Sequence, residues 1–285
     1  MSVVESSARS VTAQVPYIRS DLDRVFVEFT ARILGPDRVE QKTVEILNGR
    51  AAAEPPSLER EGFQLITWPS RVVRERVDEL KAEKPVLKMP QAHIDYWDET
   101  IPLIQKLSGA DEVLPVHASG VRFSARADKM KTHMTPAGWA HLDYDPDEAA
   151  VQLRETFEFN GREPKAYRRY VLYQGWRAIT PPPQDFPLAL CSGRTVGAED
   201  IVPIDYHLNS AGRDVMVRSR GARFSPRHQW WYFPDMTLDE MLIFKGFDSA
   251  SPNEVQTLHT AFDDPTVADA IPRASVETRY FALYD

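Results

Sequence analysis

The chain has little of what marks secreted or membrane proteins. Only one of its 285 residues, Cys191, is a cysteine. This excludes an intramolecular disulfide and a zinc site built from several cysteines. No apolar run approaches the roughly 20 residues that a helix needs to span a bilayer, and the N-terminal stretch lacks the charged and then apolar pattern of a signal peptide. We therefore expect a soluble, cytoplasmic protein.

Basic residues are outnumbered. Lys and Arg total 34 against 42 Asp and Glu, which gives a formal net charge of −8. The basic residues are scattered, so they form no run or stripe that could follow a phosphate backbone. We expect neither nucleic acid nor a membrane as a partner, and a homodimer is the default oligomeric state of a soluble protein.

Glycine is also infrequent, with 13 residues, and no Gly/Ser-rich linker divides the chain. Hydrophobic residues make up 42% of the sequence, which suffices for one large core. We expect a single domain over residues 1–285, in which residues 1–110 supply flanking strands and helices and residues 111–285 form a β-rich core.

Hydrophobic periodicity predicts the individual elements. Residues 1–20 are polar and are expected to be loose. The predicted elements that follow are strands at 24–29 and 42–47 and helices at 70–82, 91–110 and 145–157. Gly109 is placed to end the second helix. Six or more turn-separated strands in the C-terminal two thirds favour an antiparallel sandwich or a barrel-like jelly roll, so the predicted fold is mainly β with flanking helices.

The pattern His-x-Asp occurs twice, in a chain with seven histidines and 42 acidic residues. Taken alone, so short a pattern is weak evidence for a metal site. The first copy, His93 and Asp95, opens a predicted amphipathic helix. Asp95 is well explained there because a carboxylate in the first turn compensates the helix dipole.

The second copy, His141 and Asp143, lies in "HLDYDPDEAA", at the end of a predicted strand and directly before a helix. Residues two apart in a strand point to the same face, so the imidazole and the carboxylate can converge on one ion. The alternative is that Asp143 caps the following helix and His141 is a surface residue.

A third histidine and an Arg-x-Ser follow late in the chain. His259 comes 118 residues after His141, and Arg273, with Ser275 two further on, comes 14 residues after His259, before a final strand. A jelly-roll oxygenase supplies its third iron ligand and the clamp for its oxoacid in this order.

Several stretches share this order with one enzyme family. They are "VEILNGR", "PPSLEREGFQL", "VHASGVRFS", "AHLDY", "YQGWRAITPPPQDFPLALCSGRT", "RHQWWYFPDMTLDEMLIFKGFDS" and "LHTAF" with "PRASVETR". Together they cover most of the chain, which resembles the non-haem Fe(II)- and 2-oxoglutarate-dependent oxygenases of the hydroxylase/desaturase group. That group includes gibberellin desaturases and a cephem methoxylation protein. Cys191-Ser192 stands where the family often carries an aspartate, and "WRAI" replaces Trp-Arg-Pro.

The resemblance implies the cofactors and their ligands. His141, Asp143 and His259 would bind Fe(II), leaving positions for a bidentate oxoacid and O2. Arg273 and Ser275 would hold the distal carboxylate of 2-oxoglutarate. The reaction would be hydroxylation, desaturation or oxidative cyclisation of a small molecule, in secondary metabolism.

Two alternatives remain at this point. One is a cupin-like metalloenzyme that does not use 2-oxoglutarate, and the other is a non-catalytic partner subunit of a biosynthetic enzyme. For Arg273 the alternative is a surface salt bridge with an acidic loop residue.

Further polar and aromatic residues are candidates for the pocket wall. The candidates for substrate binding are Arg122, Tyr144, Trp176 and Arg177. The two arginines would suit a substrate carboxylate, whereas the alternative for all four is an outward-facing strand position. His228 is interpreted as structural or pocket-lining. Lys245 lies among apolar neighbours, so it either extends its ammonium group to solvent or is buried with a partner.

Overall fold

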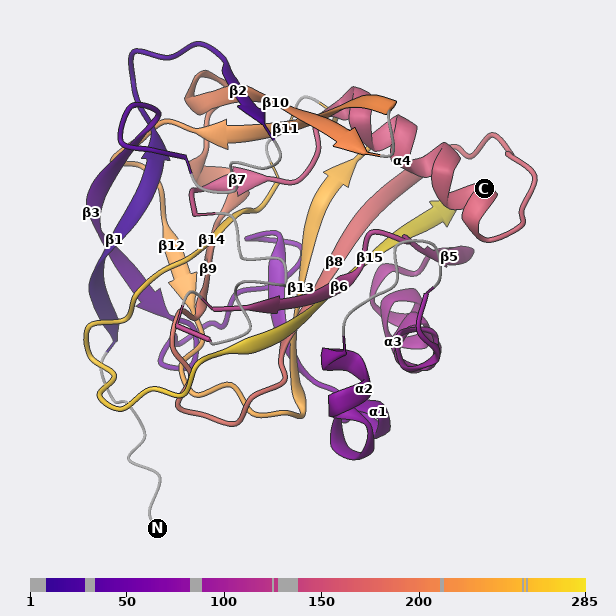
Figure 1. The fold of residues 1–285 in the computed structure, drawn as a ribbon, viewed down its shortest axis with the longest axis horizontal. Coiled ribbons are helices and arrows are strands. Elements are labelled where there is room, and N and C mark those ends of the chain that lie inside the picture. The colour runs from indigo at the N-terminus through magenta and orange to yellow at the C-terminus, as the bar shows by residue number, and fades with distance from the viewer. Residues whose placement is uncertain are drawn as a thin grey trace.

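The structure is a computed structural model of the chain. It describes residues 9–28, 34–82, 89–124, 126–127, 138–210, 213–252, 254 and 256–285, without the side chains of 208–215. Two twisted sheets face each other in this part of the chain, and helices lie outside them (Figure 1). No helix within it is long and apolar enough to cross a membrane.

The larger sheet has nine strands among the described residues, in the order β1-β3-β12-β9-β14-β7-β11-β10-β2. Their bounds are β1 Ser10–Ile18, β2 Val25–Glu28, β3 Val39–Asn48, β7 His141–Leu142, β9 Leu188–Cys191, β10 Ile201–Ser210, β11 Arg213–Ala222, β12 Trp230–Tyr232 and β14 Leu258–Ala261. Most neighbouring pairs are antiparallel, whereas β12 pairs with β3 and β10 with β2 in parallel. Strands distant in sequence therefore lie side by side, as a jelly roll requires.

The smaller sheet follows the order β4-β13-β8-β15-β5, with β6 also paired to β15. Its strands are β4 Phe63–Thr67, β5 Glu112–Pro115, β6 Gly120–Phe123, β8 Arg169–Ala178, β13 Glu240–Asp248 and β15 Ala274–Tyr284. The long strands β8 and β15 are paired in register from Ser275 with Ala178 to Tyr284 with Arg169. The candidate site lies next to this pair of strands.

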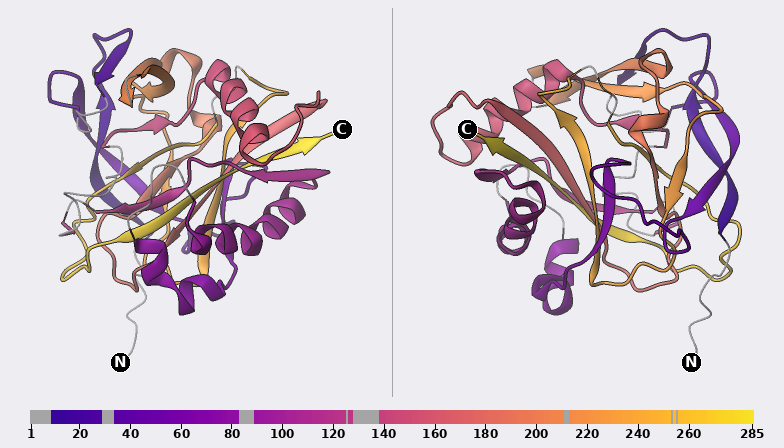
Figure 2. Two further views of the ribbon diagram at one scale, coloured as in Figure 1. Left: turned by 45° about the vertical axis from the view of Figure 1, so that its right-hand side comes forward. Right: turned by 180° about the vertical axis from the view of Figure 1, so that it is seen from behind.

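Helices cover the outer face of the smaller sheet. Figure 2 shows α1 (Arg71–Glu75), α2 (Val77–Lys81) and α3 (Gln91–Ser108) on the side of β8 and β15 that faces away from the larger sheet. α4 (Pro146–Phe159) packs instead against β11 and β5. The predicted end of α3 at Gly109 is confirmed, because this residue has a positive φ of 64° and donates its N–H to the carbonyl of Gln105.

Two sequence predictions need correction. Residues 10–18 are not loose but form β1, which pairs with β3 and buries Val11, Val15 and Tyr17. The single helix predicted at 70–82 is split at Arg76, whose φ of −134° lies outside the helical range. Arg76 bonds both Glu79 and Asp95, so it ties the second short helix to α3.

Candidate metal centre

Three predicted ligands meet between the two sheets. His141 on β7 and His259 on β14 are direct partners across the antiparallel pairing of these strands. Asp143 follows β7, and its Oδ1 lies 3.6 Å from Nε2 of His141 and 3.9 Å from Nε2 of His259. The ligand atoms of the three residues all lie within 4.8 Å of one another. This spacing and the donor set suit one metal ion.

Backbone carbonyls orient both imidazoles. Nδ1 of His141 lies 2.8 Å from the carbonyl oxygen of Trp139, and Nδ1 of His259 lies 3.4 Å from that of Thr257. When Nδ1 carries the proton and donates to a carbonyl, Nε2 presents its lone pair, which is the form that binds a metal. Both Nε2 atoms face Asp143 here.

Burial keeps the His259 imidazole neutral. Burial and, after it, the neighbouring His141 together lower the pKa of His259 to about 4, against the opposing charge of Asp143. A neutral imidazole at neutral pH is ready to coordinate, since no proton has to leave first.

Asp143 does not cap the following helix. That role belongs to Asp145, whose side chain accepts a hydrogen bond from the backbone N–H of Glu148 at 2.7 Å. Asp143 accepts instead from Nε and Nη2 of Arg279, at 2.9 and 2.7 Å. Burial would raise the pKa of Asp143, but Arg279 and the two histidines outweigh it and hold that pKa well below its usual value.

One face of β15 presents a polar row toward the interior. Its members, at the start of the strand and along it, are Arg273, Ser275, Glu277 and Arg279. Alternate residues in between are apolar or small and pack against the helices or within the sheet, as Ala274 and Val276 do. The first two members are predicted from the sequence, whereas Glu277 and Arg279 are not. Their signal was present as the alternation in "RASVETR".

Arg273 is a buried cation at the end of this row. Its residue is 2% exposed, which excludes the alternative of a surface salt bridge. Nε donates to the carbonyl of Phe186 at 2.8 Å, Nη1 donates to the Ser275 hydroxyl, and the guanidinium stacks 5.3 Å above the Trp176 ring. Burial lowers the pKa of Arg273 to about 10, so the side chain stays charged at neutral pH.

The other predicted pocket residues are divided between the two faces of the sheet. Arg122 is brought to the site, where its Nε donates to Glu277 at 3.0 Å, and Trp176 lies under Arg273. Tyr144 is 7% exposed and packs with the cluster around α4. Arg177 is not brought to the site, because it points toward the helices and donates to the Tyr96 hydroxyl and the Trp68 carbonyl.

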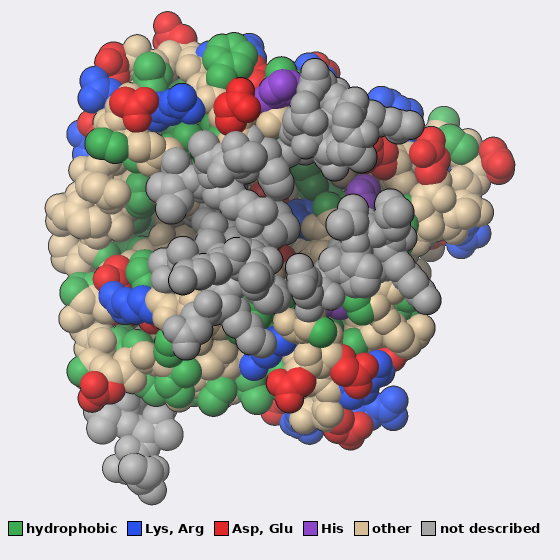
Figure 3. All heavy atoms as spheres, viewed as in Figure 1, with side chains coloured by type: hydrophobic (Ala, Val, Ile, Leu, Met, Phe, Trp, Pro, Cys, Tyr) green, Lys and Arg blue, Asp and Glu red, His purple; other side chains and the backbone are tan. Residues whose placement is uncertain are grey.

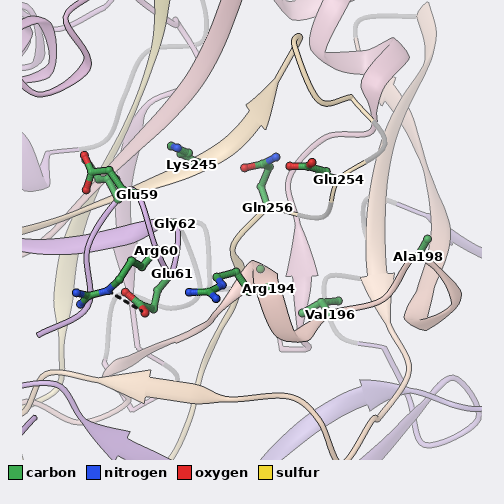
Figure 4. Close-up of a pocket in the computed structure, with 12 residues that line it drawn as sticks. Glu59, Arg60, Glu61, Gly62, Arg194, Val196, Ala198, Lys245, Glu254 and Gln256 are labelled. Atoms are coloured by element: carbon green, nitrogen blue, oxygen red, sulfur yellow. Dashed lines mark ion pairs between the residues drawn. The ribbon is translucent and has the colours of Figure 1, made fainter. Parts of the chain in front are cut away.

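His228 and Lys245 lie away from the three ligands. His228 contacts the Tyr17 hydroxyl at 3.0 Å and Asp200 at 3.3 Å, so it links β1 to the region before β12 and is structural. Lys245 is half-buried and lines a cavity of about 440 Å³. Figure 4 shows that this cavity is also bordered by Arg60, Glu61 and Arg194, and none of its lining residues belongs to the metal cluster.

The described surface carries charges of both signs. Figure 3 shows acidic and basic side chains next to one another in the described part of this face. Ion pairs among the described residues include Arg50 with Glu240 and Arg126 with Asp263, both at 2.7 Å. The charges that need an explanation are therefore the buried ones.

Known proteins are similar to this chain in sequence and in fold. A family model described as oxidoreductase/YMDC permease-like domain matches residues 28–283. The chain belongs to this oxidoreductase family. Relatives of this oxidoreductase include the Fe(II)/2-oxoglutarate-dependent dioxygenase nvfI of Aspergillus novofumigatus, 29% identical over 190 residues, which are 65% of each chain. The hydroxylase/desaturase efuI of Hormonema carpetanum is 26% identical over 298 residues, covering 97% of this chain and 96% of that protein.

A solved structure extends the comparison to the fold. That of the iron and alpha-ketoglutarate-dependent endoperoxidase NvfI has a TM-score of 0.76 and 20% identity, over 97% of this oxidoreductase and 98% of that chain. The predicted jelly roll is thereby confirmed. The names of the relatives confirm the predicted resemblance to the Fe(II)- and 2-oxoglutarate-dependent hydroxylase/desaturase group.

Proposed function

We propose that this oxidoreductase is an Fe(II)- and 2-oxoglutarate-dependent oxygenase that hydroxylates, desaturates or oxidatively cyclises a small molecule of secondary metabolism. The observation that carries the proposal is that two features lie in the same interior of the protein. The clustered side chains of His141, Asp143 and His259 lie between the sheets, and the buried guanidinium of Arg273 begins the polar row on β15 that ends beside Asp143.

The residues present fit Fe(II). Two imidazoles and one carboxylate are the donors of the facial triad in non-haem iron oxygenases, which leaves positions for other ligands. The hydrogen bonds from Nδ1 to backbone carbonyls point both Nε2 atoms at the same place. We therefore assign His141, Asp143 and His259 as the iron ligands.

The residues around Arg273 fit the distal carboxylate of 2-oxoglutarate. A guanidinium binds a carboxylate through two parallel N–H bonds, and the Ser275 hydroxyl adds a third donor. Nε and Nη1 of Arg273 are committed to Phe186 and Ser275, which fixes the plane of the guanidinium before any ligand arrives. The Trp176 ring supports its face.

When bound, iron and 2-oxoglutarate supply with O2 the oxidising chemistry that attacks an unactivated C–H bond. The chain's own task is to orient the reactants and to exclude water. The Phe244 ring lies 5.0 Å from the ring of His259, and Trp139 lies 6.1 Å from that of His141. These aromatic rings limit access of water to the two imidazoles.

An anaerobic titration tests the proposal. Apo-protein receives Fe(II) and then 2-oxoglutarate while the weak visible charge-transfer band of the chelate is followed, in wild type and in His259→Ala. We expect the band only in wild type and only after both additions. A folded wild-type protein that shows no band contradicts the proposal.

The two alternatives give different results in further assays. A cupin-like metalloenzyme would bind metal in wild type but would not consume 2-oxoglutarate. Arg273→Ala would therefore have no such consumption to remove. A non-catalytic partner subunit would bind no metal, and His259→Ala would change only its stability. The proposed enzyme should lose 2-oxoglutarate consumption in both variants.

A further inference from the structure

Arg279 holds Asp143 in an unusual way. Both Nε and Nη2 donate to the same carboxylate oxygen, Oδ2, at 2.9 and 2.7 Å, and neither bonds Oδ1. The remaining nitrogen, Nη1, donates to the backbone carbonyl of Ala118. All three nitrogens of the guanidinium are therefore engaged, and its plane is fixed between β15 and the segment after β5.

The second oxygen of Asp143 points the other way. Oδ1 is the atom that lies 3.6 Å from Nε2 of His141 and 3.9 Å from Nε2 of His259. The carboxylate is thus divided into one oxygen held by the protein and one that faces the other two ligands.

A second ion pair lies behind Arg279. Oε2 of Glu277 lies 3.6 Å from Nη2 of Arg279 and accepts a hydrogen bond from Nε of Arg122 at 3.0 Å. Two carboxylates and two guanidiniums therefore form one chain of opposite charges in the interior. Such a chain compensates the cost of burying each charge alone, so Arg279 can remain next to Asp143.

The way a carboxylate binds decides how many positions remain on a metal ion. A carboxylate that binds through both oxygens occupies two positions, and one that binds through a single oxygen occupies one. Two histidines and a single oxygen leave three positions of an octahedral ion for a bidentate oxoacid and O2, whereas a bidentate aspartate would leave two.

We propose that Arg279 is a positioning residue that restricts Asp143 to binding the metal through Oδ1 alone. The inference rests on the proposed function, because it assumes a metal at the three ligands. Arg279 acts through Asp143 and does not itself bind the metal. Residues that orient metal ligands in this way typically contribute 10-fold to 100-fold in metal affinity.

The variant Arg279→Lys separates positioning from charge. Lysine keeps the cation, but it lacks the planar fork that reaches Oδ2 from two nitrogens while a third holds Ala118. Arg169→Lys is the matched control. Arg169 also binds an aspartate, Asp248, but it is the first residue of β8, where it is paired with Tyr284, and it binds both carboxylate oxygens.

The measurement is the affinity for Co(II), followed by its visible absorption in the folded apo-proteins. We expect Arg279→Lys to bind Co(II) about 10-fold to 100-fold more weakly than wild type, and Arg169→Lys to stay within about twofold. A purely structural role of Arg279 would lower the melting temperature and leave the Co(II) affinity of the folded protein within about threefold of wild type, which overturns the inference.

A second measurement needs no variant, so it decides the matter if Arg279→Lys does not fold. In a crystal structure of wild type loaded with Co(II), we expect Asp143 to bind through Oδ1 with Oδ2 still on Arg279. Both oxygens on the metal, or Arg279 displaced from Asp143, overturns the inference. If wild type binds Co(II) and 2-oxoglutarate, such a result leaves the proposed function in place. If wild type binds no Co(II), the proposed function fails and this inference fails with it.

Discussion

His141 and His259 are 118 residues apart in the sequence but are direct partners across β7 and β14, with their ring centroids 4.3 Å apart. A cross-strand pair of this kind is held at fixed separation by the backbone of both strands. The candidate metal site therefore depends on the pairing of distant strands in the larger sheet and is not a local feature of "HLDY".

On the proposal that both imidazoles bind one ion, their substitutions should not be additive. We expect His141→Ala and His259→Ala each to weaken Co(II) binding by more than about 100-fold, since loss of an orienting residue alone costs 10-fold to 100-fold. The double variant should be little worse than either single one, because groups that act as a unit couple strongly. Calorimetric titration of the folded proteins measures this.

His93→Gln provides the control for that experiment, because His93 belongs to the other His-x-Asp pair, on α3. Its Co(II) affinity should equal that of wild type. Additive losses in the two cluster variants, or a loss in His93→Gln, would mean that the histidines do not share one ion.

Arg273 should be needed for the oxoacid but not for the metal. Removing one partner of a buried, hydrogen-bonded charge pair costs about 2–5 kcal/mol, so Arg273→Met should raise the Kd for 2-oxoglutarate by roughly 30-fold or more. Arg273→Lys should recover part of this loss, because it keeps the charge but not the fork. Competition binding at saturating Co(II) measures the Kd, and the Co(II) affinity itself serves as the internal control. Equal loss of metal and oxoacid affinity would instead indicate a general collapse of the site.

Spacing in the sequence was sufficient to place two of the three candidate ligands together. Residues two apart on a strand share a face whatever the rest of the fold does, so His141 and Asp143 could be paired from spacing alone. It was not sufficient for Arg279, because its partner Asp143 lies 136 residues away. No local pattern encodes a contact of that kind.

The two faces of β8 explain why Trp176 and Arg177 could not be told apart. Both are buried, at 4% and 0% exposure, because the strand lies between the larger sheet and the helices. A strand buried on both faces loses the alternation that reveals its orientation. β1 shows the converse, because Val11, Ala13, Val15 and Tyr17 alternate with Thr12, Gln14 and Pro16, and this alternation, not the polar content of the segment, indicates the strand.

The Cys191 thiol should be unreactive in the native protein. Its residue is fully buried, and burial raises the pKa of this thiol to about 12. Because the thiolate is the reactive form, iodoacetamide at pH 8 should modify the folded chain far more slowly than the urea-unfolded chain. Mass spectrometry counts the adducts. Rapid labelling of the native protein would show that β9 opens readily. β9 is the strand that pairs with β14, which carries His259.

His228 should make the stability of the protein depend on pH. Burial lowers the pKa of His228, and nearby Arg227 adds to this, while Asp200 opposes it without reversing it. Above the pKa of the unfolded chain, about 6.5, the residue is neutral in both states and its contribution is fully present. As the pH falls below that value the unfolded chain takes up a proton that the folded chain resists, so the free energy of unfolding decreases, by at most about 1.4 kcal/mol per pH unit for one proton.

Urea unfolding at pH 7.5 and 5.5 should therefore show a smaller difference for His228→Gln than for wild type. Glutamine can still bond Tyr17 and Asp200, so its stability at pH 7.5 should stay close to wild type, and an unchanged pH dependence would show that the hydrogen bonds to Tyr17 and Asp200 accommodate the protonated ring.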